Sequence, residues 1–223
     1  MAQSEEAAAV PVDLWSWRLA GGDPGLLSPD ERDRAERFVM ARDRDRFVSG
    51  RARLRAIVAG YLGEAPGAVR FRYGAWGRPE LDGLHFSLSH SGDRAVLAVS
   101  RDVPVGADIE AVRAVDLDLA RSVFTPGERR TLAALPAAER VAAFLRGWTR
   151  KEAYLKGRGT GLSTDLQSFE VTLGQDEARL LRCASGEAGL WRLEDLETGP
   201  DLAGAVAARS GGRPLRLAWR ASE

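Results

Sequence analysis

The spacing of apolar residues changes along the first hundred positions, and each change indicates a new element. Helical spacing begins at Ser28, where Pro29 and Glu31 complete a capping box, and it returns over residues 43–61. Alternation of apolar and polar residues elsewhere predicts strands. The strands predicted in this half cover residues 10–19, 69–73, 85–89 and 95–100.

The second half shows the same order of helix followed by strands. A long helix is expected over residues 137–156, ended by Gly157. Helices followed by strands, twice, predict an α+β protein of two similar lobes, residues 1–104 and 105–223. The strands predicted in this half cover residues 169–173, 179–183, 191–196, 202–209 and 215–219.

Composition narrows the class of protein. The chain has 223 residues, a formal net charge of zero and 44% apolar residues, which is typical of an ordered globule. Zero net charge gives no general attraction to nucleic acid or to an anionic membrane. No apolar run reaches the roughly 20 residues that span a bilayer. One cysteine, Cys183, cannot form an internal disulfide, and we expect a cytoplasmic protein.

The kind of basic residue is more informative than the total. Of 32 basic residues only Lys151 and Lys156 are lysines, and they lie five positions apart. Lysine is a compact charge with a tunable pKa, whereas guanidinium stays charged. The pair therefore indicates that arginine would not serve in this segment, although chance clustering is the alternative.

Acidic residues near these lysines suggest a cation site. Asp108 and Glu110 lie two apart in a predicted strand, so their carboxylates share one face and repel unless a cation such as Mg²⁺ lies between them. Trp148, Glu152 and Lys156 fall at helical spacing on one face. Taken separately, each pattern is also typical of a solvated acidic strand or a surface ion pair.

Two glycines and a serine–histidine pair add to this picture. Gly106 precedes the acidic pair and lets a ligand approach the backbone closely. Ser89 and His90 end a predicted strand before Gly92, where a hydroxyl, an imidazole and turn amides can cradle a phosphate. A hydrolase triad with Asp93 is disfavoured, because no G-x-S-x-G elbow occurs.

Taken together, these segments resemble the surfactin-type (Sfp-type) 4′-phosphopantetheinyl transferases over nearly the whole chain. The family pattern has a G-K-P loop, then S-H-S, then G-x-D-x-E, then W-[ST]-x-K-E-A-x-x-K. The corresponding segments here read GRP at 77–79, SHS at 89–91, GADIE at 106–110 and WTRKEAYLK at 148–156. Four short motifs in the right order are far more specific than any one of them.

The resemblance implies a catalytic centre. Asp108, Glu110 and Glu152 would gather around Mg²⁺, which bridges the pyrophosphate of coenzyme A. Lys156 would contact the phosphate chain and act in catalysis. Glu152, directly or through metal-bound water, is the candidate base for the carrier serine. None of these residues departs from the family pattern, so an active enzyme is expected.

The resemblance also implies how coenzyme A is held. Ser89 and His90 would bind the nucleotide phosphates, with Lys156 on the same phosphate chain. Arg78, which stands where the family has lysine, would act near the adenine end, and Arg46 would contact the 3′-phosphate. The implied fold is two pseudo-symmetric α+β lobes, each a small antiparallel sheet with helices, with the ligand cleft between them.

The implied reaction moves phosphopantetheine from coenzyme A to a serine of an apo acyl or peptidyl carrier protein, and it releases adenosine 3′,5′-bisphosphate. Such enzymes serve secondary metabolite biosynthesis, and we expect a monomer that binds neither nucleic acid nor membrane. Another Mg²⁺-dependent phosphotransferase is an alternative, although no G-x-x-x-x-G-K-[ST] loop occurs. A non-catalytic module that binds carrier proteins or nucleic acid is a second alternative.

Overall fold

The computed structural model describes residues 8–74, 77–161 and 164–221. Most helices and strands lie where the apolar spacing predicts them. The first half contains β1 (Val10–Arg18), α1 (Pro29–Glu36), α2 (Ala41–Leu62), β2 (Arg72–Tyr73), β3 (Pro79–Glu80), β4 (His85–Ser91) and β5 (Arg94–Ser100). The second half contains β6 (Val105–Ala111), α3 (Ala120–Val123), α4 (Pro126–Ala134), α5 (Ala137–Arg158), β7 (Glu170–Val171), β8 (Leu180–Arg182), β9 (Arg192–Asp195), β10 (Leu202–Ala208) and β11 (Leu215–Arg220).

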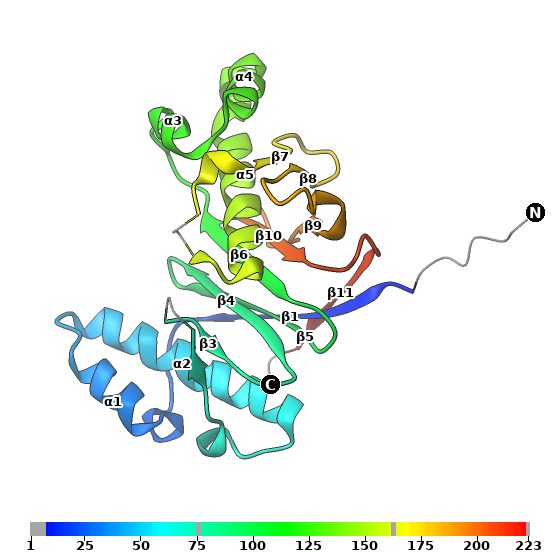
Figure 1. Cartoon of the computed structure of the whole chain (residues 1–223). Helices are drawn as coiled ribbons and strands as arrows, with labels where there is room; N and C mark the ends of the chain where they lie inside the picture. The colour runs from blue at the N-terminus through cyan, green and yellow to red at the C-terminus, as the bar shows by residue number, and fades with distance from the viewer. Residues whose placement is uncertain (1–7, 75–76, 162–163, 222–223) are drawn as a thin grey trace, which may run out of the picture.

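The strands form several small sheets with helices packed against them, which confirms the α+β class (Figure 1). One sheet has the order β11-β1-β5-β4, another has the order β6-β10-β9, and β2-β3 and β7-β8 form two-stranded ladders. The pairing of β1 with β11 is parallel, whereas the other ladders are antiparallel. Because β11 comes from the end of the chain and joins the sheet of β1, the division into lobes at residue 104 stays a prediction.

Helix α5 lies directly on strand β6, and glycine makes this contact possible. A Cβ on Gly106 would lie 2.0 Å from the carbonyl oxygen of Ala153 and 2.2 Å from the main-chain nitrogen of Gly157. The close approach that the sequence suggested at Gly106 is therefore made by a helix and not by a ligand. Gly157 lies inside α5, where a Cβ would lie 2.7 Å from the Trp191 ring and 3.2 Å from the main-chain nitrogen of Gly106. The left-handed residue that caps the helix is Gly159, at φ 72°.

The segment before β2 departs from the predicted strand. Only Arg72 and Tyr73 of the predicted strand 69–73 form a ladder. The preceding backbone is held to α2 instead, because the Arg55 guanidinium donates to the carbonyl oxygens of Pro66 and Val69 at 3.1 and 3.0 Å. Apolar and polar residues therefore alternate in this segment as in a strand, but the carbonyl oxygens before β2 accept hydrogen bonds from Arg55 rather than from a neighbouring strand.

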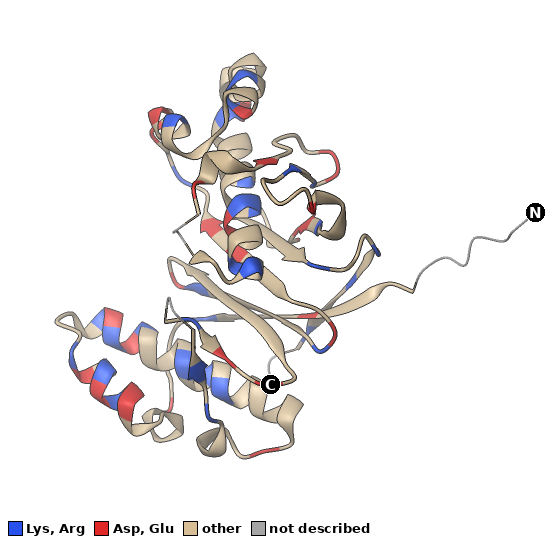
Figure 2. Ribbon diagram, in the orientation of Figure 1, with Lys and Arg blue, Asp and Glu red and all other residues tan. Residues whose placement is uncertain are grey.

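A buried ion pair joins the two N-terminal helices. Arg55 donates to Glu31 across 2.6 Å, and each side chain is 2% exposed. The same carboxylate accepts the Ser28 main-chain N–H at 3.0 Å, so the predicted capping box is present. Around this pair, acidic and basic residues are interspersed on α1 and α2 rather than gathered in a basic stripe (Figure 2).

We expect Glu31→Gln to lower the free energy of unfolding by about 3–5 kcal/mol, because it leaves the buried Arg55 charge without a counter-ion. Urea denaturation measures this change. Asp93→Asn is the matched control, since it breaks the exposed Arg18–Asp93 pair and should leave stability close to that of the wild type. Equal effects of the two substitutions would contradict the prediction.

Candidate functional site

Strands β4 and β6 lie side by side at the junction of the two main sheets, and serine hydroxyls bridge them. The N–H of Ile109 donates to Ser89 Oγ at 3.3 Å, and the N–H of Ala111 donates to Ser91 Oγ at 2.9 Å. Both serines point toward β6 because alternate residues of a strand share a face. We call this contact between β4 and β6 the serine seam.

The acidic pair of β6 faces this seam. Ser89 Oγ donates to Asp108 Oδ1 at 2.7 Å, and Ser91 Oγ donates to Glu110 Oε2 at 2.9 Å. The two carboxylates therefore lie on the same face of the strand, as their spacing predicted. Asp108 is 5% exposed, so it is one of the few acidic side chains in the core of the protein.

Lys156 of α5 reaches the same point from a third element. Its Nζ donates to Asp108 Oδ1 at 2.6 Å and to Ser89 Oγ at 2.9 Å. The Lys156 side chain is 30% exposed, so part of it remains open to solvent. The structure thus brings together three predicted site residues, one each from β4, β6 and α5.

The negative charges of the carboxylates in the site are only partly balanced by the ammonium group of Lys156. Burial raises the pKa of Asp108, Glu110 raises it further, and the ammonium of Lys156 together with hydrogen bonds from Lys156 and Ser89 opposes this rise. Burial also raises the pKa of Glu152, and the charges of Asp108 and Glu110 add to the rise while Lys156 opposes it. Each carboxylate therefore lies within electrostatic reach of the others.

Two carboxylate oxygens in the site, Asp108 Oδ2 and Glu152 Oε1, are buried without a hydrogen-bond partner among the described residues. Buried polar atoms of this kind are uncommon and are often satisfied by an ion. Hard cations such as Mg²⁺ take oxygen ligands, so this donor set fits the ion. Within the described ranges, however, no three acidic, histidine or cysteine side chains are already gathered around one centre.

A cavity of about 580 Å³ opens beside the seam, and two more of the predicted site residues line it. Arg46 of α2 and the exposed His90 of β4 both line it. Arg34 and Arg51 line it as well, and their guanidinium groups lie 5.2 and 5.7 Å from the centre of the Phe47 ring. With Arg46 they give this cavity three arginines, all of them from α1 and α2.

Arg78 is used differently. Its guanidinium donates to three main-chain carbonyl oxygens: those of Lys156, of Phe86 at 2.5 Å and of Val105 at 3.2 Å. It therefore ties α5 to β4 and β6, and it lines a different cavity from the one that contains Arg46 and His90. A role for Arg78 near the adenine end stays a prediction.

The two lysines have different environments. Lys151 is fully buried and pairs with Glu128 at 2.9 Å. It also donates to the carbonyl oxygens of Leu166 and Phe169, both at 2.8 Å. The two neighbouring lysines therefore have different roles: Lys151 stabilises the core, and Lys156 belongs to the site.

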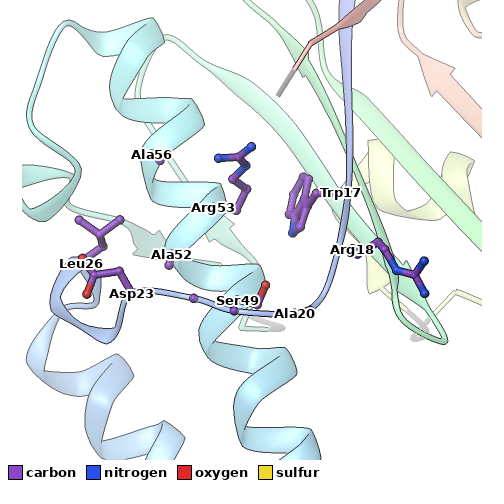
Figure 3. A pocket seen from close by; sticks show the side chains of 11 residues that line it. Trp17, Arg18, Ala20, Asp23, Leu26, Ser49, Ala52, Arg53 and Ala56 are labelled. Carbon is purple, nitrogen blue, oxygen red and sulfur yellow. The ribbon is translucent and has the colours of Figure 1, made fainter. Parts of the chain in front are cut away.

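Another cavity, of about 390 Å³, lies between the end of β1 and a different face of α2 (Figure 3). Trp17, Arg18, Ser49 and Ala52 are among the residues that line it, and the Arg18 side chain pairs with Asp93 at 2.5 Å. None of the predicted site residues lines this cavity. The candidate site is therefore the serine seam with Lys156 and the neighbouring cavity that contains Arg46.

Comparison with known proteins shows the family to which the chain belongs. Residues 104–208 match the family described as 4′-phosphopantetheinyl transferase superfamily, and residues 23–102 match 4′-phosphopantetheinyl transferase, N-terminal. The chain is 40% identical to 4′-phosphopantetheinyl transferase HetI of Nostoc sp., over 86% of this chain and 85% of that protein. It is 33% identical to 4′-phosphopantetheinyl transferase Sfp of Bacillus subtilis, over 68% of each chain.

A solved holo-[acyl-carrier-protein] synthase of Thermotoga maritima superposes with a TM-score of 0.39 at 20% identity, over 51% of this chain and 65% of that chain. The two family matches together cover both halves of the sequence, and the match to the Nostoc protein runs through all four motifs. The chain therefore belongs to the 4′-phosphopantetheinyl transferase family.

Proposed function

We propose that the serine seam, Lys156 and the Arg46 cavity carry out Mg²⁺-dependent transfer of phosphopantetheine from coenzyme A to a serine of an acyl or peptidyl carrier protein. Family membership implies an enzyme that uses coenzyme A, so the non-catalytic module is set aside. The observation that supports this site most strongly is the contact of Lys156 with Asp108, beside two buried carboxylate oxygens without partners.

The proposed binding mode places the anionic parts of coenzyme A against the basic residues. Arg46 and His90 line one cavity and would hold the nucleotide phosphates there. Lys156 would turn its ammonium from Asp108 toward the pyrophosphate, for which the open side of its chain leaves room. Ser89 would follow as a hydrogen-bond donor or acceptor to the same group.

Asp108, Glu110 and Glu152 would hold Mg²⁺ through their oxygens. The chemistry that Mg²⁺ would supply there is neutralisation of pyrophosphate charge and polarisation of the reacting phosphoryl group. Glu152 would accept the proton from the carrier serine, whose oxygen forms the new bond to the pantetheine-side phosphorus. The bond between that phosphorus and the oxygen bridging the two phosphorus atoms would break, and adenosine 3′,5′-bisphosphate would leave with the bridging oxygen and its electron pair, with Lys156 stabilising its charge.

The remaining proposals concern partners and location. We propose a monomer, because residues of a single chain meet at the site. The interspersed charges on α1 and α2 favour a protein that does not bind nucleic acid (Figure 2). Within the described ranges, no helix has the length and apolar character needed to cross a bilayer. We further propose a cytoplasmic enzyme that serves secondary metabolite biosynthesis.

Incubation of the chain with coenzyme A, Mg²⁺ and an apo carrier protein tests the function. We expect mass spectrometry to show a carrier heavier by one phosphopantetheine group, and no gain when EDTA is added or when the acceptor serine is alanine. A panel of apo acyl and peptidyl carriers guards against a poor choice of partner. Transfer that continues in EDTA would contradict the metal requirement, and no transfer to any carrier by a folded, coenzyme A-binding sample would contradict the reaction.

A further inference from the structure

The motif S-H-S contributes a second serine, Ser91, to the seam, and its hydroxyl has a defined orientation. A hydroxyl group carries one hydrogen and two lone pairs. The oxygen of Ser91 accepts the N–H of Ala111 at 2.9 Å, and its hydrogen goes to Glu110 Oε2, also at 2.9 Å. Ser91 therefore fixes one oxygen of the Glu110 carboxylate against the backbone of its own strand.

Ser89, two residues before Ser91 on β4, makes the same pair of hydrogen bonds to β6. Its oxygen accepts the N–H of Ile109 and its hydrogen goes to Asp108. Two serines that are two apart on β4 thus match two carboxylates that are two apart on β6. The difference lies in the third partner, because Lys156 also contacts Ser89 and Asp108, whereas neither Ser91 nor Glu110 has a cation partner within the described residues.

We propose that Ser91 is a positioning residue that orients the Glu110 carboxylate for Mg²⁺, an inference that rests on the metal site proposed above. Groups that hydrogen-bond to metal-ligating side chains set the direction of the ligand oxygen, and their loss typically costs about 10–100-fold in metal affinity or activity. Glu110 is only half-buried, so without Ser91 its side chain samples rotamers that point away from Asp108.

The test compares Ser91→Ala with three variants. Ser91→Thr keeps the hydroxyl at a half-buried strand position, and threonine is a residue that strands favour. Ser87→Ala is the matched control, because Ser87 lies on the same face of β4 but makes no bond to a carboxylate in the described part of the chain. Asp108→Asn removes a proposed ligand outright.

The readout is binding of Mn²⁺ alone, an oxygen-seeking ion whose free form is counted directly by electron paramagnetic resonance. We expect Ser91→Ala to weaken binding about 10-fold or more, and Ser91→Thr and Ser87→Ala to bind as the wild type does. In turnover assays, Ser91→Ala should need more Mg²⁺ for half-maximal rate and recover most of its rate at saturating Mg²⁺.

Each other outcome overturns something specific. If Ser91→Ala binds Mn²⁺ as the wild type does while Asp108→Asn does not, the metal site stands and Ser91 is structural only. If Ser87→Ala weakens binding equally, or Ser91→Thr fails to restore it, the effect comes from general loosening of β4 and the positioning role is wrong. If the folded wild type binds no Mn²⁺, the metal site itself is wrong, and this inference falls with it.

Discussion

Glu152→Gln should lower turnover by about 10²–10⁴ even at saturating Mg²⁺, because the amide cannot accept the proton of the carrier serine. Asp108→Asn should also lower turnover, but raising Mg²⁺ should restore part of it, since an amide oxygen is a weaker ligand rather than none. Steady-state rates over a range of Mg²⁺ concentrations separate the two cases. Near-normal turnover of Glu152→Gln at saturating Mg²⁺ would show that Glu152 is neither the base nor an essential ligand.

Stability measurements keep this result from being confused with unfolding. Glu152 Oε1 is buried without a hydrogen-bond partner, and Asp108 and Glu110 repel its charge. Removing that charge should therefore leave the free energy of unfolding equal to or above the wild-type value. Glu139→Gln, at an exposed position in the first turn of the same helix, is the matched control and should leave both turnover and stability unchanged.

Gly106→Ala is expected to damage both the fold and the site. The new Cβ would meet main-chain atoms of α5 at 2.0 and 2.2 Å, and a helix backbone cannot give way as a flexible side chain does. Overpacking typically costs about 1–3 kcal/mol, and we expect the upper end or more here. Displacement of α5 also moves Glu152 and Lys156, and misplacement by about 1 Å is enough to cost on the order of 10²-fold in rate.

Gly204→Ala provides the control within the same sheet. Its Cβ would lie 3.1–3.3 Å from side-chain atoms of Ile109, Leu196 and Thr198, which can shift by a few tenths of an ångström. We expect this variant to keep its turnover and to lose little stability in urea denaturation. A Gly106→Ala protein with wild-type stability and rate would mean that α5 can move off β6 without cost, and that the close contact does not position the site.

Local signals in the sequence predicted most elements because each depends on neighbouring residues. The capping box at Ser28, the alternation of β4 and the continuous apolar run of β5 are signals of this kind. The prediction that Gly157 ends the long helix was wrong, because α5 continues to Arg158 and Gly157 instead leaves space for the ring of Trp191, which is distant in the sequence. The pairing of β11 with β1 was not predictable either, since the two strands are about two hundred residues apart.

The site divides in the same way. The spacing of Asp108 and Glu110 was enough to place their carboxylates on one face. The contact of Lys156 with Asp108 depends on how α5 packs on β6, which no short window of sequence contains. The role of Ser91 was missed although a signal existed: two serines spaced by two precede two acids spaced by two. The preassembled three-carboxylate centre that the family resemblance implied stays a prediction.

Because the chain has so few lysines, an amine-specific reagent can label the site selectively among lysine side chains. The chain has two lysines, and the Lys151 side chain is 0% exposed while that of Lys156 is 30% exposed. Amine-acylating reagents, which label most proteins at many surface lysines, should therefore react here with Lys156 of the site and with the α-amino group of the chain. The label on Lys156, located by peptide mass spectrometry, should be lost when coenzyme A is bound, and this loss would report occupancy of the site without any engineered probe.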